Sequence, residues 1–206
     1  MVIDDLANRP HDADLLLDQS GGRAATNYSG LVSSKCKLML GPKFSLLRKD
    51  FSTPPISPKK SSVKKTPCIF ISMGATDENN LTTPILKTLL HIAPQANVDI
   101  LLSNGAPHIK KVKEICAKLG NVKLHVNVPN PVKIMSNATF AIGTAGINLW
   151  ERCALGLPSI IFAVAENQLL NASYVVKHGG GILAGSSSKI DRDILANSIL
   201  KIIQNG

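Results

Sequence analysis

The pattern of apolar and polar positions divides the chain into two unlike parts. From residue 68 onward, short apolar runs alternate regularly with segments of helical periodicity. Before residue 51 only three short apolar runs occur, and turn-forming residues separate them. Continuous apolar strands that alternate with helices are typical of a parallel sheet with helices on both faces. The second part is therefore predicted to be an α/β, Rossmann-like domain.

In this second part, each predicted strand is followed by a predicted helix. We expect strands at residues 68–73, 98–102, 122–126, 139–142, 159–164 and 181–183, and helices at 81–92, 107–119, 132–136, 147–155, 169–177 and 192–203. Sheets of this kind bind ligands at the carboxyl ends of their strands. The turns after Met73, Ile142 and Val164 would form one site if their strands are neighbours in the sheet.

The first part does not make a complete domain by its own pattern. Its predicted strands at residues 2–3, 15–17 and 37–40 have no covering helix. Such short strands alone would leave edges and faces exposed that proteins normally cover. We therefore expect residues 1–51 to be the C-terminal remnant of a larger Rossmann-like domain, and the chain to begin partway through it.

Residues 52–67, rich in proline, lysine and serine, are interpreted as a linker between the two parts. A long surface loop is the alternative, and either reading places a boundary here. The segment also supplies four lysines of a net charge of +9. Only five Phe, one Trp and two Tyr are present, without aromatic and basic residues interleaved, so the charge does not favour nucleic-acid binding.

Composition narrows the class of protein further. Of 206 residues, 44% are hydrophobic and 18% charged, as in globular proteins. The apolar run 160–165 is too short to span a bilayer, and the start of the chain lacks a signal-peptide pattern. The four cysteines are widely spaced, without C-x-x-C or a zinc-type spacing. We expect a cytoplasmic protein with reduced thiols and with neither a metal nor a cofactor.

The turn Gly143–Gly146 carries the most specific chemistry. It lies between an apolar run and a predicted helix, where backbone N–H groups and the positive end of the helix dipole favour an anion such as phosphate. One turn into the helix, Glu151 would repel a phosphate but could accept hydrogen bonds from ribose hydroxyls. Together they predict a nucleotide site. The alternative is an ordinary strand-to-helix turn with a solvated glutamate.

Two other turns are weaker candidates. The turn containing Gly74, Ala75 and Thr76 could contribute a second phosphate contact, or Thr76 or Asp77 could simply cap the next helix. The amides after residue 165 suit recognition of a sugar, or belong to a capped helix start. Gly179–Gly181 follows a predicted helix and is better explained as a helix C-cap with a tight turn than as a phosphate loop.

Several separated stretches resemble one family, the nucleotide-sugar hydrolases of pseudaminic acid biosynthesis. They include Val2–Arg9, His11-Asp12, Asp14–Gln19, Leu40–Arg48, Trp150–Arg152, Gly156–Pro158 and Glu166–Gln168. The family removes UDP from UDP-2,4-diacetamido-2,4,6-trideoxy-β-L-altropyranose. It shares a glycosyltransferase-B-type fold of two Rossmann domains with the glycosyltransferase that makes lipid II. The resemblance implies that residues 68–206 are the C-terminal, nucleotide-binding half of this fold.

The resemblance also assigns positions in this sequence to parts of the ligand. It places uracil against the backbone near Val128 and Pro129 and ribose on Glu151. Asn167, Gln168 and Asn171 would face the sugar. The diphosphate would lie on two turns, which comprise Gly74, Ala75, Thr76, Gly143, Thr144, Ala145, Gly146, Ile147 and Asn148.

Two departures from the family pattern concern binding and catalysis. Ala145, Ile147 and Asn148 stand where the family carries glycine and a hydroxyl residue, so backbone amides would have to bind the phosphate. The family's first strand also leads into a G-x-G-H-x-x-R loop, whose histidine acts on the attacking water. This sequence has no such loop, and His11, which is structural or lines a cleft, is a weak candidate for that role.

Three hypotheses therefore remain: part of a UDP-sugar hydrolase, a UDP-sugar-binding module without activity, and a glycosyltransferase that uses a UDP-sugar donor. The expected ligand is a UDP-sugar in each case. A separately encoded N-terminal half would be the expected protein partner of a hydrolase.

If residues 52–67 are a linker, limited proteolysis should cut there first, because chain that is not packed is accessible to proteases. A stable fragment beginning near Cys68, identified by mass spectrometry, is the expected product. Protection of this segment while later sites are cut would contradict the linker interpretation.

Overall fold

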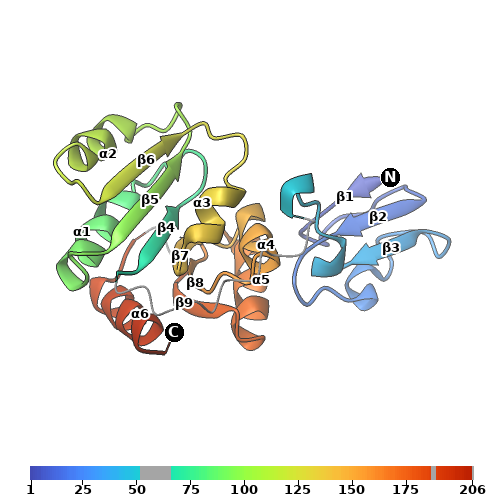
Figure 1. Cartoon of the computed structure of the whole chain (residues 1–206). Coiled ribbons are helices and arrows are strands. Elements are labelled where there is room, and N and C mark those ends of the chain that lie inside the picture. Colours follow the sequence, from blue (N-terminus) through green and yellow to red (C-terminus); the bar gives the residue numbers. More distant parts are fainter. Residues whose placement is uncertain (52–65, 187–188, 206) are drawn as a thin grey trace.

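The computed structural model describes residues 1–51, 66–186 and 189–205. Residues 52–65 of the predicted linker lie outside the described residues. The described residues form two sheets, a small one near the N-terminus and a larger one after residue 67 (Figure 1).

The larger sheet has the strand order β6-β5-β4-β7-β8-β9, and all its described pairings are parallel. The chain runs outward from β4 to one edge and then returns to build the other half from β7. The reversal makes β4 and β7 neighbours and opens a crevice at their carboxyl ends. The strands are β4 (Cys68–Ser72), β5 (Asn97–Leu102), β6 (Val122–Val126), β7 (Phe140–Thr144), β8 (Ser159–Phe162) and β9 (Gly181–Gly185).

Helices cover both faces of this sheet, as the alternating pattern predicted. One face packs against α1, α2 and α6 through a cluster that includes Ile85 and Leu195. The other packs against α3, α4 and α5 through two smaller clusters around Leu149 and Met135. The helices are α1 (Thr82–Ile92), α2 (Ile109–Cys116), α3 (Val132–Asn137), α4 (Ile147–Ala154), α5 (Glu166–Lys177) and α6 (Arg192–Asn205).

Two boundaries near the predicted site differ from the expected ones. Strand β7 continues to Thr144, because Gly143 and Thr144 pair with Ile161 and Phe162 of β8. The turn before α4 therefore shortens to Ala145 and Gly146. Helix α5 begins at residue 166 instead of 169, and its first turn is closed by a hydrogen bond from the Gln168 amide to the Ala165 carbonyl.

The Gly179–Gly181 stretch is a helix end, as predicted. Gly179 has a φ of +75°, which favours glycine, and the amide of Gly180 donates to the carbonyl of Val175. Gly181, the last residue of this stretch, is already the first residue of strand β9.

The N-terminal part forms a three-stranded parallel sheet in the order β1-β2-β3. Its strands are β1 (Val2–Ile3), β2 (Leu15–Asp18) and β3 (Lys37–Leu40), and its described helices are the short 3-10 turns η1 (Ala25–Tyr28), η2 (Pro42–Phe44) and η3 (Lys49–Phe51). Figure 1 shows this sheet beside α4 and α5.

Close packing at Phe51 and at Gly21 helps to attach the N-terminal part to the larger domain. Phe51 is 2% exposed and packs with Phe70, Met135 and Leu157 in the core. Gly21 lies directly against the Tyr174 side chain of α5, where a Cβ would overlap the tyrosine. The end of the first part is thus part of the core of the second.

Gly181 allows β9 to approach β8 closely, and its substitution tests the packing of this edge. A Cβ at residue 181 would overlap the carbonyl oxygen of Ser159, which is backbone and cannot turn aside. We expect Gly181→Ala to lower the free energy of unfolding by about 1–3 kcal/mol, the usual cost of overpacking, as measured by urea denaturation. Gly120→Ala, where open space surrounds the position, is the control and should change it by less than about 0.5 kcal/mol. Equal stability of the two variants would contradict this packing.

Candidate functional site

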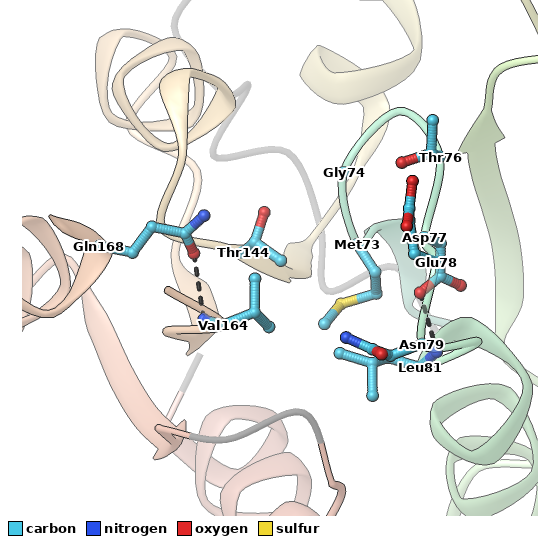
Figure 2. Close-up of a pocket in the computed structure, with 10 residues that line it drawn as sticks. All are labelled: Met73, Gly74, Thr76, Asp77, Glu78, Asn79, Leu81, Thr144, Val164 and Gln168. Atoms are coloured by element: carbon cyan, nitrogen blue, oxygen red, sulfur yellow. Dashed lines mark hydrogen bonds between the residues drawn. The ribbon is translucent and has the colours of Figure 1, made fainter. Parts of the chain in front are cut away.

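A pocket of about 220 Å³ lies at the carboxyl ends of β4, β7 and β8, where the strand order reverses. It brings together Gly74, Thr76, Thr144 and Gln168, four residues that the sequence proposed for the site (Figure 2). They come from three separate parts of the chain: the turn after β4, the end of β7 and the first turn of α5. The remaining lining residues are Met73, Asp77, Glu78, Asn79, Leu81 and Val164.

The first of these turns follows β4 and leads towards α1. Gly74 has a φ of +95°, a left-handed conformation that favours glycine. The capping alternative is realised by Asp77, whose buried carboxylate accepts hydrogen bonds from the amides of Leu81 and Thr82 at 2.8 and 2.9 Å. Thr76 is not needed as a cap and lines the pocket instead.

The second turn offers fewer amides than its sequence suggested. The Ala145 amide donates to the Phe162 carbonyl at 3.0 Å and continues the β7–β8 pairing. The amides of Gly146, Ile147 and Asn148 stand at the start of α4, where a helix has no acceptors of its own to offer them. Of the amides that the sequence proposed for an anion at this turn, that of Ala145 is therefore engaged in the sheet, and those of residues 146–148 stand at the helix start.

Glu151 is buried, and its carboxylate is paired with an arginine from the N-terminal part. Arg48 donates from Nε to one carboxylate oxygen at 2.8 Å and from a terminal nitrogen to the other at 2.9 Å. The same guanidinium donates to the carbonyl of Pro129 at 2.7 Å and lies 5.2 Å from the ring centre of Phe51. Arg48 thereby connects the predicted ribose residue with the predicted uracil contact, while Val128 lies half-buried next to Pro129.

The three side-chain amides on α5 that were predicted to face the sugar make different contacts. Gln168 accepts a hydrogen bond from the Val164 amide, and its side-chain nitrogen is close to Gly146 (Figure 2). Asn171 accepts from the amide of Gly21 and donates to the carbonyl of Ala145. Of the three predicted sugar residues, therefore, only Gln168 lines the pocket.

Asn167, the remaining amide, contacts the N-terminal part. Its side chain donates to the carboxylate of Asp5 at 2.9 Å. Asn167 and Asn171 thus hold the N-terminal loops against α5 in this structure.

A buried polar network lies at the carboxyl ends of β1 and β2. The Tyr28 hydroxyl contacts the carboxylates of Asp18 at 2.7 Å and Asp4 at 3.0 Å. Burial and these two carboxylates raise the pKa of Tyr28 well above its usual range. Burial also opposes ionisation of Asp4, but hydrogen bonds from Ala7 and Tyr28 outweigh it and lower the pKa of this carboxyl.

His11 belongs to this network. Its side chain is 8% exposed, and Nε2 lies 3.5 Å from a carboxylate oxygen of Asp4. Its backbone amide donates to Leu31. His11 is not among the residues that line the pocket, and no hydrogen bond to its Nε2 occurs among the described residues.

Two arginines were missed when candidate residues were chosen from the sequence. Arg48 stands in a stretch without regular pattern, so nothing local indicated its partner 103 positions later. Arg152 is fully buried on α4 and donates to the carbonyl of Thr144 at 2.7 Å. One signal did exist for Arg152: a glycine inside a strand, here Gly143, often marks the close approach of another group.

Neither a cluster of metal ligands nor a membrane-spanning helix occurs in the described part of the chain. No three histidine, cysteine, aspartate or glutamate side chains gather there as metal ligands would. None of its helices combines the length and the apolar character required to cross a bilayer.

Comparison with known proteins gives relatives over most of the chain. The UDP-2,4-diacetamido-2,4,6-trideoxy-β-L-altropyranose hydrolase of Campylobacter jejuni is 28% identical over 83% of this chain and 60% of its own length. The spore coat polysaccharide biosynthesis protein SpsG of Bacillus subtilis is 21% identical over 82% of this chain and 48% of its own length. The chain thus spans about half to three fifths of these relatives.

Among solved structures, MurG of Acinetobacter baumannii superimposes with a TM-score of 0.62, at 18% identity, over 92% of this chain and 57% of its own. This likeness establishes the fold, a Rossmann-like sheet of the glycosyltransferase-B type, as predicted. Residues 68–206 match the glycosyltransferase family 28 C-terminal domain along their whole length. Two thirds of the chain carry this match, and the protein therefore belongs to the glycosyltransferase family 28 C-terminal domain family.

Proposed function

We propose that this chain binds a UDP-sugar at the carboxyl ends of β4 and β7 and is the nucleotide-binding part of a UDP-sugar hydrolase. The observation that carries the proposal is the placement of the first turn of α4. The amides of residues 146–148, which have no acceptor within the helix, and the carboxylate of Glu151 lie about one turn apart at the start of α4. An anion site and a hydroxyl acceptor at this spacing suit a phosphate joined to a ribose.

The surroundings of Glu151 are compatible with ribose binding. A carboxylate has about four lone-pair positions, and Arg48 uses two of them. The others remain for the two hydroxyls of a ribose. Arg48 holds the carboxylate in place from the side of Pro129, whose carbonyl lies where we propose that the base binds.

The proposed substrate class follows from the relatives. The hydrolase from Campylobacter jejuni, which aligns with 83% of this chain, is named for its action on a UDP-linked diacetamido sugar. An amide such as Gln168, which lines the pocket beside the proposed phosphate site, suits the acetamido and hydroxyl groups of such a sugar. We therefore propose a UDP-diacetamido sugar as the ligand and release of UDP as the reaction of the complete enzyme.

Substitution of Glu151 tests the proposed ribose contact. A hydrogen bond to a charged group contributes about 1.5–3 kcal/mol, so Glu151→Ala should weaken UDP binding by about tenfold to a hundredfold in calorimetry. Trp150, the only tryptophan, is adjacent and gives a second, fluorescence readout.

Arg48→Ala is the matched control, because it breaks the same ion pair but keeps the carboxylate. It should weaken UDP binding by clearly less than Glu151→Ala does. Equal losses in both variants would mean that Glu151 serves only to hold Arg48. An unchanged affinity in the glutamate variant would remove this residue from the site.

We further expect the chain as given to bind the nucleotide sugar without releasing UDP at an enzymatic rate. A positioned general base typically contributes about 10²–10⁴-fold to the rate. The one histidine in residues 1–51 is His11, and it is enclosed against Asp4. The measurement is UDP release from the UDP-diacetamido sugar by the parent chain and by His11→Ala. Rapid turnover by the parent that disappears in the variant would show that His11 is the catalytic group.

A further inference from the structure

Arg152 is a buried cation with no carboxylate partner in the described part of the chain. The side chain is 0% exposed, and its one hydrogen bond is the donation to the Thr144 carbonyl. The Nε and Nη1 atoms have no hydrogen-bond partner. The neighbouring acid, Glu151, is paired with Arg48 instead. Leaving such a charge unpaired in the interior is costly, so its retention calls for a compensating partner.

The guanidinium lies directly behind the turn that we propose binds phosphate. A Cβ at residue 143 would overlap Nη1 of Arg152 and come within 2.7 Å of the Ser72 carbonyl oxygen. Only a glycine leaves room for the cation at this point of β7. Thr144, whose carbonyl accepts from Arg152, lines the pocket itself, so one residue separates the charge from the ligand space.

The group keeps its charge in this position. Burial lowers the pKa of Arg152 to about 10, and this value still leaves the guanidinium protonated at neutral pH. A positive charge surrounded by protein is weakly screened by salt, so it acts over several ångströms more strongly than a surface lysine would.

We propose that Arg152 is a positioning residue for the diphosphate of the nucleotide: its buried charge stabilises the bound anion through the Gly143–Thr144 backbone, without touching it. The inference rests on the proposed function of this site. It explains why the turn can bind phosphate although the Ala145 amide is engaged and no hydroxyl residue starts α4. The start of the helix supplies hydrogen bonds, and Arg152 supplies the full positive charge behind them.

The test compares ligands that share the nucleoside and differ in the number of phosphates, and therefore in charge. Calorimetry would measure uridine, UMP and UDP against the parent chain, Arg152→Gln and Arg152→Lys. Both replacements carry an N–H donor for the Thr144 carbonyl, but only lysine keeps a charge. We expect Arg152→Gln to bind UDP about tenfold or more weakly and UMP less affected, with uridine unchanged, and Arg152→Lys to recover most of the UDP affinity.

Two controls separate this role from a structural one. Lys123→Met removes one positive charge from the exposed, amino end of β6 and should leave all three affinities unchanged. Thermal unfolding without ligand shows whether each variant folds. Arg152→Met, which keeps an unbranched apolar chain of similar length, replaces Arg152→Gln should the latter not fold, because it removes the cost of burying an unpaired charge.

The outcomes are distinct. Equal losses for uridine and UDP in the neutral variant would make Arg152 a structural residue, and full UDP affinity in that variant would also overturn the proposal. A parent chain that binds no UDP would refute the nucleotide site itself. A loss that grows with ligand charge and is rescued by lysine supports the electrostatic role.

Discussion

The parallel pairing of β4 with β7 is the constraint on which the rest of the structure depends. These strands are consecutive in space but lie about seventy residues apart in sequence, in the register Ile69 to Phe140 through Ser72 to Gly143. Their pairing fixes where the strand order reverses. The turns that follow them must then face one another across the crevice, and the pocket forms between those turns.

Close packing beside β4 and β7 restricts which residues can occupy the proposed site. Gly143 lacks a side chain because a charged group from α4 fills the space beside it. That group, Arg152, is fully buried, while the preceding residue Glu151 is held by Arg48 from the N-terminal part. These adjacent residues of opposite charge thus have different partners, Arg48 for the acid and the Thr144 carbonyl for the base. The acid faces the proposed nucleoside side, and the base lies behind the proposed phosphate turn.

The N-terminal part adds more than a neighbouring sheet. It contributes Arg48 to the site, Phe51 to the core of the second part, and loops that bond to the amides of α5. These contacts explain how three short strands without a covering α-helix are held in place. They also mean that residues outside the family 28 match help to shape the site within it.

The sequence by itself determined the fold class and the edge of the sheet at which the pocket lies. Because strands and helices have different periods, the alternation after residue 68 specified a parallel sheet covered by helices. The first amides of the helix that starts near Ile147 lack acceptors within that helix, whatever surrounds them. Local patterns reach only a few residues. Glu151 and Asn171 bind residues more than a hundred positions away, Arg48 and Gly21. Gly143 is contacted by Arg152, because helix α4 packs back against the strand that precedes it. Only tertiary packing could decide that Arg48 binds the glutamate, that the Ala145 amide is used by the sheet, and that Arg152 is buried without a counter-ion among the described residues.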